Sequence, residues 1–230
     1  MILQRLATAI RKQDWFTVVI ETLIVVFGVY LGIQLGNWNA ASNAAREETV
    51  ILEQLHSQFE DFVAITEVRL EQQRDSLRAT DQLLEVIATG KEPDDRNLMI
   101  NILQRAGRLK DAPTAPTTLL ELISSGRLSE LSSATLRGQL TQFQQQLAEH
   151  RNIAAIALHR ISDPTTGRHK AVISKPYTLA EVVDYNWELI PEMRAEQQVL
   201  QIGKYHLTEQ MAGLIELAKA ILSEIEAVQP

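Results

Sequence analysis

A largely apolar stretch from Trp15 to Trp38 constrains this 230-residue chain more than any other feature. It reads WFTVVIETLIVVFGVYLGIQLGNW, and a bilayer core of roughly 30 Å needs about 20 apolar helical residues. Tryptophan stands at both ends, where amphipathic rings prefer the headgroup layer. The sequence therefore predicts a transmembrane helix over residues 15–38. Its lipid–water interfaces are predicted at Trp15 on one side and at Asn37, Trp38 and Asn39 on the other.

Three glycines recur at every fourth position of this stretch, at Gly28, Gly32 and Gly36. At 100° per residue, Glu21 falls within about 20° of the same helical face. Helices in a bilayer associate where small residues let their backbones approach, so this face predicts contact with a second copy or with another membrane protein. For Glu21 three roles stay open: snorkelling or structural pairing, docking to a partner, and an ion site.

Charged residues around the apolar stretch predict its orientation. Arg5, Arg11 and Lys12 precede it, whereas only Arg46, then Glu47 and Glu48, follow it. Basic residues stay on the cytoplasmic side, so the bulk of the chain is expected outside the cytoplasm, in the periplasm of a bacterium with the anchor in its inner membrane. A cleaved signal peptide is the alternative, but the apolar region exceeds a typical signal core. The predicted domains are a cytoplasmic amphipathic N-terminus (1–14), a transmembrane helix (15–38) and a periplasmic helical bundle (39–230).

The composition favours helices and excludes several kinds of chemistry. Only 5% of residues are aromatic, and Ala, Leu, Gln and Glu are plentiful, so an all-α fold is expected. The chain contains no cysteine, which excludes disulfides, thiolate nucleophiles and cysteine-based metal sites. A net charge of −7 indicates a soluble acidic surface rather than a nucleic-acid partner.

Three long segments carry heptad repeats of apolar residues, which predicts long helices packed up and down in an antiparallel bundle. They lie at about 40–89, from 134 onward, and at about 192–228. Their stripes are Leu52, Leu55, Phe59, Phe62, Val63, Leu70, Leu77 and Leu84; then Leu136, Leu140, Phe143, Leu147, His150, Ala154, Ala157 and Ile161; then Leu200, Leu207, Met211, Leu214, Ala218, Ile221, Ile225 and Val228.

Shorter elements are predicted between these segments. A helix is expected at about 95–109, and capping-box spacing is seen at Thr118–Glu121 and again at Thr178–Glu181, the latter opening a short helix that ends near Pro191. Residues 163–176 are expected to form a loop. The basic residues in and just before this loop predict either a solvated surface or a contact for an anionic partner, and they are Arg160, Arg168, Lys170 and Lys175.

No pattern in the sequence indicates catalysis. The five histidines show no metal-binding spacing, and His150 falls in an apolar stripe, which favours a core-edge role. Nucleophile elbows, phosphate-cradling loops and nucleotide fingerprints are missing from the sequence. We therefore expect no enzyme activity, no cofactor and no metal.

Two segments resemble a large family of uncharacterised bacterial single-span membrane proteins. The string from Glu21 to Asn39 is similar to the family's membrane glutamate, V-V-x-G core, following glutamine and N-N-W-N exit. Gly36 stands where the family often has its first asparagine. Residues 118–128, TLLELISSGRL, are similar to the family's T-x-x-x-L-x-S-S-G-x-L segment. The resemblance implies membrane anchorage and helical structure but no activity.

Two functional hypotheses follow from these features. The first is a non-enzymatic structural or accessory subunit that contacts lipid and self-associates or joins a larger membrane complex through the Glu21 and glycine face. The alternative is a periplasmic ligand-sensing module, which would signal through a partner. A pocket lined by polar residues between the bundle helices would favour sensing, and an apolar core with an exposed apolar stripe would favour assembly.

Overall fold

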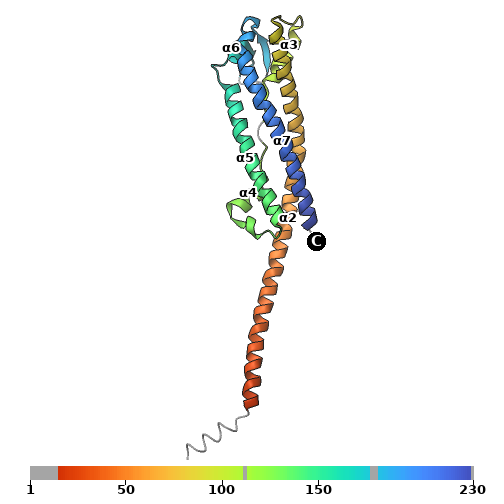
Figure 1. Cartoon of the computed structure of the whole chain (residues 1–230), viewed down its shortest axis with the longest axis vertical. Helices are drawn as coiled ribbons and strands as arrows, with labels where there is room; N and C mark the ends of the chain where they lie inside the picture. Colours follow the sequence, from red (N-terminus) through yellow and green to blue (C-terminus); the bar gives the residue numbers. More distant parts are fainter. Residues whose placement is uncertain (1–14, 111–112, 177–180, 229–230) are drawn as a thin grey trace, which may run out of the picture. The chain divides into compact units, whose positions relative to one another are not determined.

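The computed structural model describes residues 15–110, 113–176 and 181–228, with side chains from Val19 onward. The chain divides into two compact units, Met1–Val50 and Ile51–Pro230. The first helix, α2, extends from Trp15 to Thr89 and contributes to both units (Figure 1). The predicted amphipathic N-terminus at residues 1–14 lies outside the described residues.

The described residues confirm an all-α fold with one small sheet. Gly90, with φ of +65°, follows the last residue of α2, as expected for a glycine that ends a helix. The remaining elements are α3 (Arg96–Ala106), α4 (Thr117–Ser124), the 3₁₀ helix η1 (Arg127–Glu130), α5 (Ala134–Ser162), α6 (Gly167–Ala171), β1 (Val172–Ser174), β2 (Val182–Tyr185), the 3₁₀ helix η2 (Trp187–Met193) and α7 (Arg194–Val228).

The main core of the second unit lies among α2, α4, α5 and α7, and Figure 1 shows the three long helices side by side. Three aromatic rings form its centre. Phe143 of α5 meets Phe59 and Phe62 of α2 edge to face, with ring centroids 5.0 Å apart in each pair. Edge-to-face pairs at this distance stabilise the fold beyond the burial of the rings alone.

The predicted stripes of α5 and α7 are confirmed, whereas that of α2 is partly wrong. All eight stripe residues of α5 are buried, His150 included, and those of α7 are buried except for half-buried Val228. In α2, Leu52, Leu55, Phe59, Phe62 and Leu70 are buried, but Val63, Leu77 and Leu84 are only half-buried. The buried face of α2 passes instead through polar residues: Thr66, Gln73, Ser76 and Thr80.

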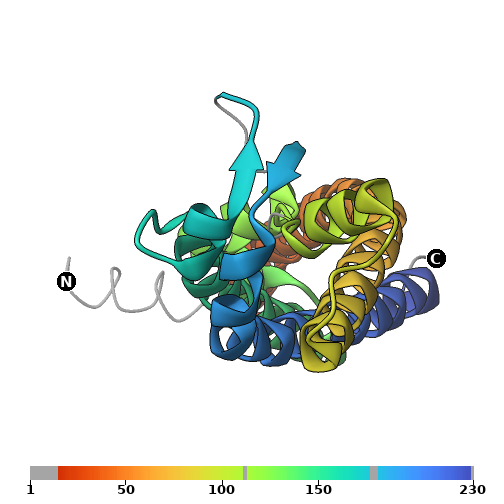
Figure 2. The ribbon, with the colours of Figure 1, turned by 90° about the horizontal axis from the view of Figure 1, so that it is seen from above.

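A second core lies at the end of the unit where α2 gives way to α3. Here β1 and β2 pair antiparallel beside the helices (Figure 2), and β2 contacts α3. The prediction of a loop over 163–176 is wrong, because this segment contains α6 and β1. The predicted helix before Pro191 is also wrong, since β2 and a 3₁₀ helix occupy those residues.

The helix caps test two further predictions. Ser133 caps α5 by accepting a hydrogen bond from the amide of Leu136 at 3.0 Å, and α5 begins at Ala134 as predicted. The capping box at Thr118 is wrong: Pro116 precedes α4, and the Thr118 hydroxyl accepts a hydrogen bond from Gln58 Nε2 at 2.8 Å. The second proposed box begins at residues 178–180, outside the described residues.

Candidate functional site

The predicted membrane face is fully exposed within the first unit. Every side chain from Ile20 to Ala41 is exposed, including Glu21 and Asn37, and Trp38 retains 74% of its accessible surface. A β-carbon added at Gly28, Gly32 or Gly36 would meet no atom within 4 Å. The side chain of Trp15 lies outside the described side chains, and Asn39 is exposed. The structure thus leaves this face open to a neighbour.

α2 is long and apolar enough to cross a membrane over part of its length. Its most apolar 18-residue window has a mean hydropathy of 1.9, and none of that window is buried. Large apolar side chains are exposed on all sides of the helix: Ile20, Leu23, Ile24, Val25, Val26, Phe27, Val29, Tyr30, Leu31, Ile33 and Leu35. Soluble proteins rarely expose a continuous apolar surface of this size.

In the second unit, an unexpected group of buried charges lies where α2, α3, α6 and α7 meet. Lys204 of α7 has no exposed surface. Its ammonium donates to Ser76 Oγ and Thr80 Oγ1, each at 2.9 Å, and to the backbone oxygen of Ala106 at 2.6 Å. All three donors of the lysine are therefore used inside the protein.

Arg168 of α6 is the second buried cation, with 4% of its surface exposed. Its Nη2 donates to the backbone oxygen of Leu103 at 3.0 Å. The guanidinium packs on Gly107, where a β-carbon would lie 2.0 Å from Nη2. Any larger residue at position 107 would displace the arginine. We refer to Lys204 and Arg168 with their hydroxyl partners Ser76 and Thr80 as the buried cation cluster.

The cluster stabilises the C-terminal end of α3. The last carbonyls of a helix lack partners within the helix and carry partial negative charge. Here the carbonyl oxygens of Leu103 and Ala106 accept hydrogen bonds from the two cations. The Ser76 hydroxyl lies 3.0 Å from the oxygen of Arg105 and 2.6 Å from that of Arg108, and its single proton serves these two acceptors. Two cations and a hydroxyl from three other elements thus add to the backbone amides of Gly107 and Arg108, which already donate to the oxygens of Leu103 and Arg105.

Burial lowers the pKa of both cations. Desolvation, followed by the charge of Arg168, lowers the pKa of Lys204 to about 7, although the carboxylate of Asp81 opposes the change. Desolvation lowers the pKa of Arg168 to about 10, opposed by Glu196. A lysine titrating near neutrality can act as a base, but this ammonium is sealed from solvent. The cluster therefore has a structural rather than a catalytic arrangement.

The four basic residues that were predicted to form either a solvated surface or a contact for an anionic partner differ in their surroundings. Arg168 is buried and so cannot belong to an exposed surface. Lys175 forms an ion pair with Glu181 at 2.6 Å. Arg160 and Lys170 are exposed. The predicted basic surface is therefore reduced, because one of its charges is bound to a helix end and a second is paired.

His150 lies in the core, as the sequence predicted. It is 1% exposed, neither ring nitrogen has a hydrogen-bond partner among the described residues, and the neighbouring polar side chain is Gln210. Burial lowers the pKa of His150 and so favours the neutral form of the ring. Among the described residues no three histidine, aspartate or glutamate side chains are grouped to hold a metal ion.

Sequence reasoning missed the buried cation cluster, although a signal was present. Lys204 stands between Leu200 and Leu207 at the four-and-three spacing of the α7 stripe. In α2, Gln73, Ser76 and Thr80 interrupt the apolar positions in the same way. When polar residues occupy the stripe positions of two helices, the helices are expected to meet through hydrogen bonds.

These features define the class of the protein: a helical bundle with a small sheet, whose first helix includes one segment of membrane-spanning length. The chain belongs to a family of unknown function, DUF6090, whose model matches residues 21–156, more than half of the chain. Neither curated proteins nor solved structures gave a significant match.

Proposed function

We propose that this protein is a non-enzymatic accessory subunit, anchored by residues 15–38 in the inner membrane of a bacterium, with its bundle in the periplasm. It assembles through the Glu21 and glycine face, with a second copy or another membrane protein. The observation that carries this proposal is the exposure of apolar side chains on every side of α2 from Ile20 to Leu35. Covering each such side chain is worth about 1.5–3 kcal/mol, so lipid or protein must cover them.

The interior of the second unit supports assembly over ligand sensing. Its main core is filled by leucine, isoleucine and phenylalanine side chains. Lys204 is one of several polar residues with no exposed surface, and protein atoms accept all three of its hydrogen bonds. The hollows described among these residues are open to solvent, and one of about 320 Å³ between α2 and α7 is lined by Leu77, Asp81, Gln201, Ile202 and Tyr205.

Replacing Gly28, Gly32 and Gly36 together with leucine is expected to disrupt assembly. Three leucines on this face keep the helix apolar, so insertion persists, but they separate the backbones that small residues let approach. The mass of the full chain in mild detergent should fall from a multiple of 25.8 kDa, or from a larger complex, to one copy.

The matched control replaces Val26, Tyr30 and Gln34 with leucine, since these residues lie roughly 160° from the glycines at 100° per residue. This variant should keep the mass of the wild type. A wild-type protein that is already a single copy in the membrane would refute the proposal. Release by alkaline carbonate, which strips peripheral proteins, would refute the anchor itself.

A second variant tests the role of Glu21. Glu21→Gln retains the shape of the side chain but removes its charge. Membrane insertion should be unchanged, and the assembled fraction measured by native electrophoresis should fall, because a carboxylate in a bilayer needs a partner. An unchanged assembled fraction would exclude docking through Glu21 and leave snorkelling to the interface as its role.

A further inference from the structure

An open hollow of about 410 Å³ lies on the second unit where α2 passes the end of α3. We call it the basic hollow. It is lined by Glu71, Gln72, Asp75, Arg78, Arg108 and Lys110.

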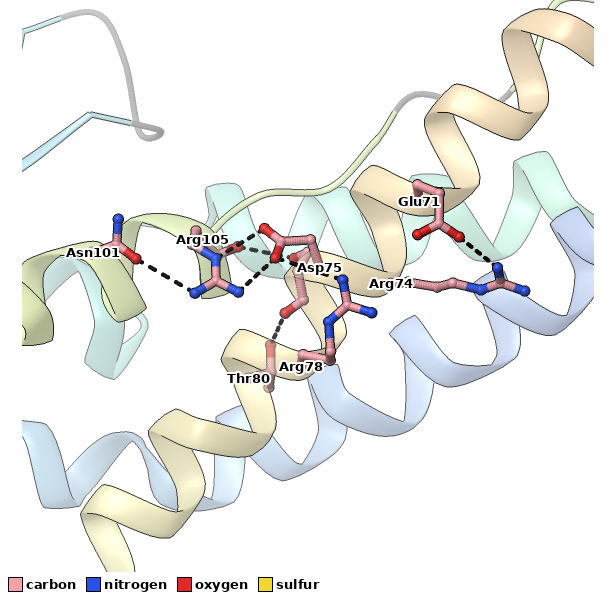
Figure 3. A network of polar contacts seen from close by, with 8 residues as sticks. Glu71, Arg74, Asp75, Arg78, Thr80, Asn101 and Arg105 are labelled. Atoms are coloured by element: carbon pink, nitrogen blue, oxygen red, sulfur yellow. Dashed lines mark hydrogen bonds and ion pairs between the residues drawn. The ribbon is translucent and has the colours of Figure 1, made fainter.

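Both carboxylates of the basic hollow are already paired with cations from outside its lining. Glu71 accepts a hydrogen bond from Arg74 at 2.6 Å. Asp75 is held by both sides of the Arg105 guanidinium, from Nε at 2.9 Å and from Nη2 at 2.6 Å, a fork that matches a carboxylate (Figure 3). The acidic residues of the lining are therefore neutralised without its own cations.

Three cations of the lining remain in excess. Arg78 forms only a long ion pair with Asp75, at 3.9 Å, and this carboxylate is already held by Arg105; the Arg78 side chain is 61% exposed. Arg108 and Lys110 form no ion pair with any described residue. The hydrogen bond from Arg105, followed by the charges of Arg78 and Arg108, lowers the pKa of Asp75, so these guanidinium groups act on the same carboxylate.

The backbone that carries Arg108 and Lys110 is fixed on α2. The Ser76 hydroxyl donates to the backbone oxygen of Arg108 at 2.6 Å. The amide of Lys110 donates to Gln73 Oε1 at 3.4 Å, a long contact that still aligns the segment. Because the backbone is already ordered, a ligand that meets these two side chains need order only their ends.

We propose that the basic hollow binds a phosphate or carboxylate group of a multivalent anionic ligand. Guanidinium groups recognise such oxyanions through paired hydrogen bonds, and an ammonium adds a point charge. The three cations of the lining repel each other, and an oxyanion bound among them would reduce that repulsion. The chain as a whole carries a charge of −7, so general attraction of anions does not explain this group.

Isothermal titration of the full chain in mild detergent with inorganic pyrophosphate tests this proposal. The wild type should bind, with affinity that falls as salt is added, because exposed charges are screened. The triple variant Arg78→Gln, Arg108→Gln and Lys110→Gln should bind at least roughly tenfold more weakly, the effect of losing charge-assisted hydrogen bonds.

Short-chain phosphatidic acid below its micelle concentration is the second probe. Tighter binding of this lipid than of pyrophosphate would identify a lipid headgroup as the source of the oxyanion. Tighter binding of pyrophosphate would identify a free phosphate as the source.

The matched control neutralises three exposed cations elsewhere, Arg160→Gln, Lys170→Gln and Arg194→Gln, and should bind like the wild type. The helicity and melting temperature of each variant are first compared with those of the wild type. If the triple variant is unfolded, the single variant Arg108→Glu, a change at an exposed side chain, replaces it in the titration. Equal binding by the wild type and the basic-hollow variants would overturn the proposal, as would failure of the wild type to bind either probe. The result does not depend on membrane assembly, because the glycine variant should bind equally well.

Discussion

Phe143→Ala is expected to lower the free energy of unfolding of the bundle by about 3–5 kcal/mol, the usual cost of removing a buried phenylalanine. Phe143 is fully buried and forms edge-to-face contacts with both Phe59 and Phe62. Its removal leaves a cavity at the place where α2 and α5 meet, and neither helix can move inward without displacing the other rings.

The measurement is denaturant unfolding of the full chain in mild detergent, followed by circular dichroism. Ile156→Ala is the control, because Ile156 lies on the same helix but is 53% exposed, and it should change the free energy by less than about 0.5 kcal/mol. A loss below about 1 kcal/mol for Phe143→Ala would mean that α2 and α5 do not pack through this residue.

The second large effect is a rise in stability with pH that depends on Lys204. The lysine has a pKa of about 7 in the folded protein, against 10.5 for an unburied lysine. Between these values the unfolded chain binds one more proton than the folded chain, so the free energy of unfolding increases with pH. The slope is on the order of 1.4 kcal/mol per pH unit. Below about pH 7 the lysine is protonated in both the folded and the unfolded chain, so its contribution to the slope disappears.

Unfolding of the wild type and of Lys204→Met should be compared from pH 7 to 9.5. Above that range Arg168, with a pKa of about 10, adds to the slope, while Tyr185, with a pKa of about 12, reduces it. Lys204→Met should lose the slope. Lys219→Met, on the exposed face of the same helix, should keep it. Equal slopes in the wild type and in Lys204→Met would show that the buried lysine stays protonated to high pH.

Much of the fold could be predicted because most of its core is apolar and regularly spaced. Every residue of the α5 stripe from Leu136 to Ile161 was predicted and is buried. The α2 stripe was partly wrong for a physical reason: Ser76 and Thr80 occupy core positions because they meet Lys204, a partner 124 or more positions away in the chain. Periodicity in one segment carries no information about such a partner.

The predicted loop failed for a related reason. Residues 172–174 form a strand only because Val182–Tyr185 pairs with them, and so short a pair is not stable by itself. The basic hollow was not predicted either, because Arg78 belongs to α2 whereas Arg108 and Lys110 follow α3.

The sequence by itself determined the apolar segment of α2, the places where most helices begin and end, and the apolar faces of α5 and α7. Local spacing is sufficient for these, because an apolar stripe needs only some apolar neighbour to cover it. The tertiary structure alone decided which cations are buried and which face solvent. Arg168 and Lys204 are buried because the end of α3 presents carbonyl oxygens to them, whereas Arg108 and Lys110 meet no such acceptor among the described residues.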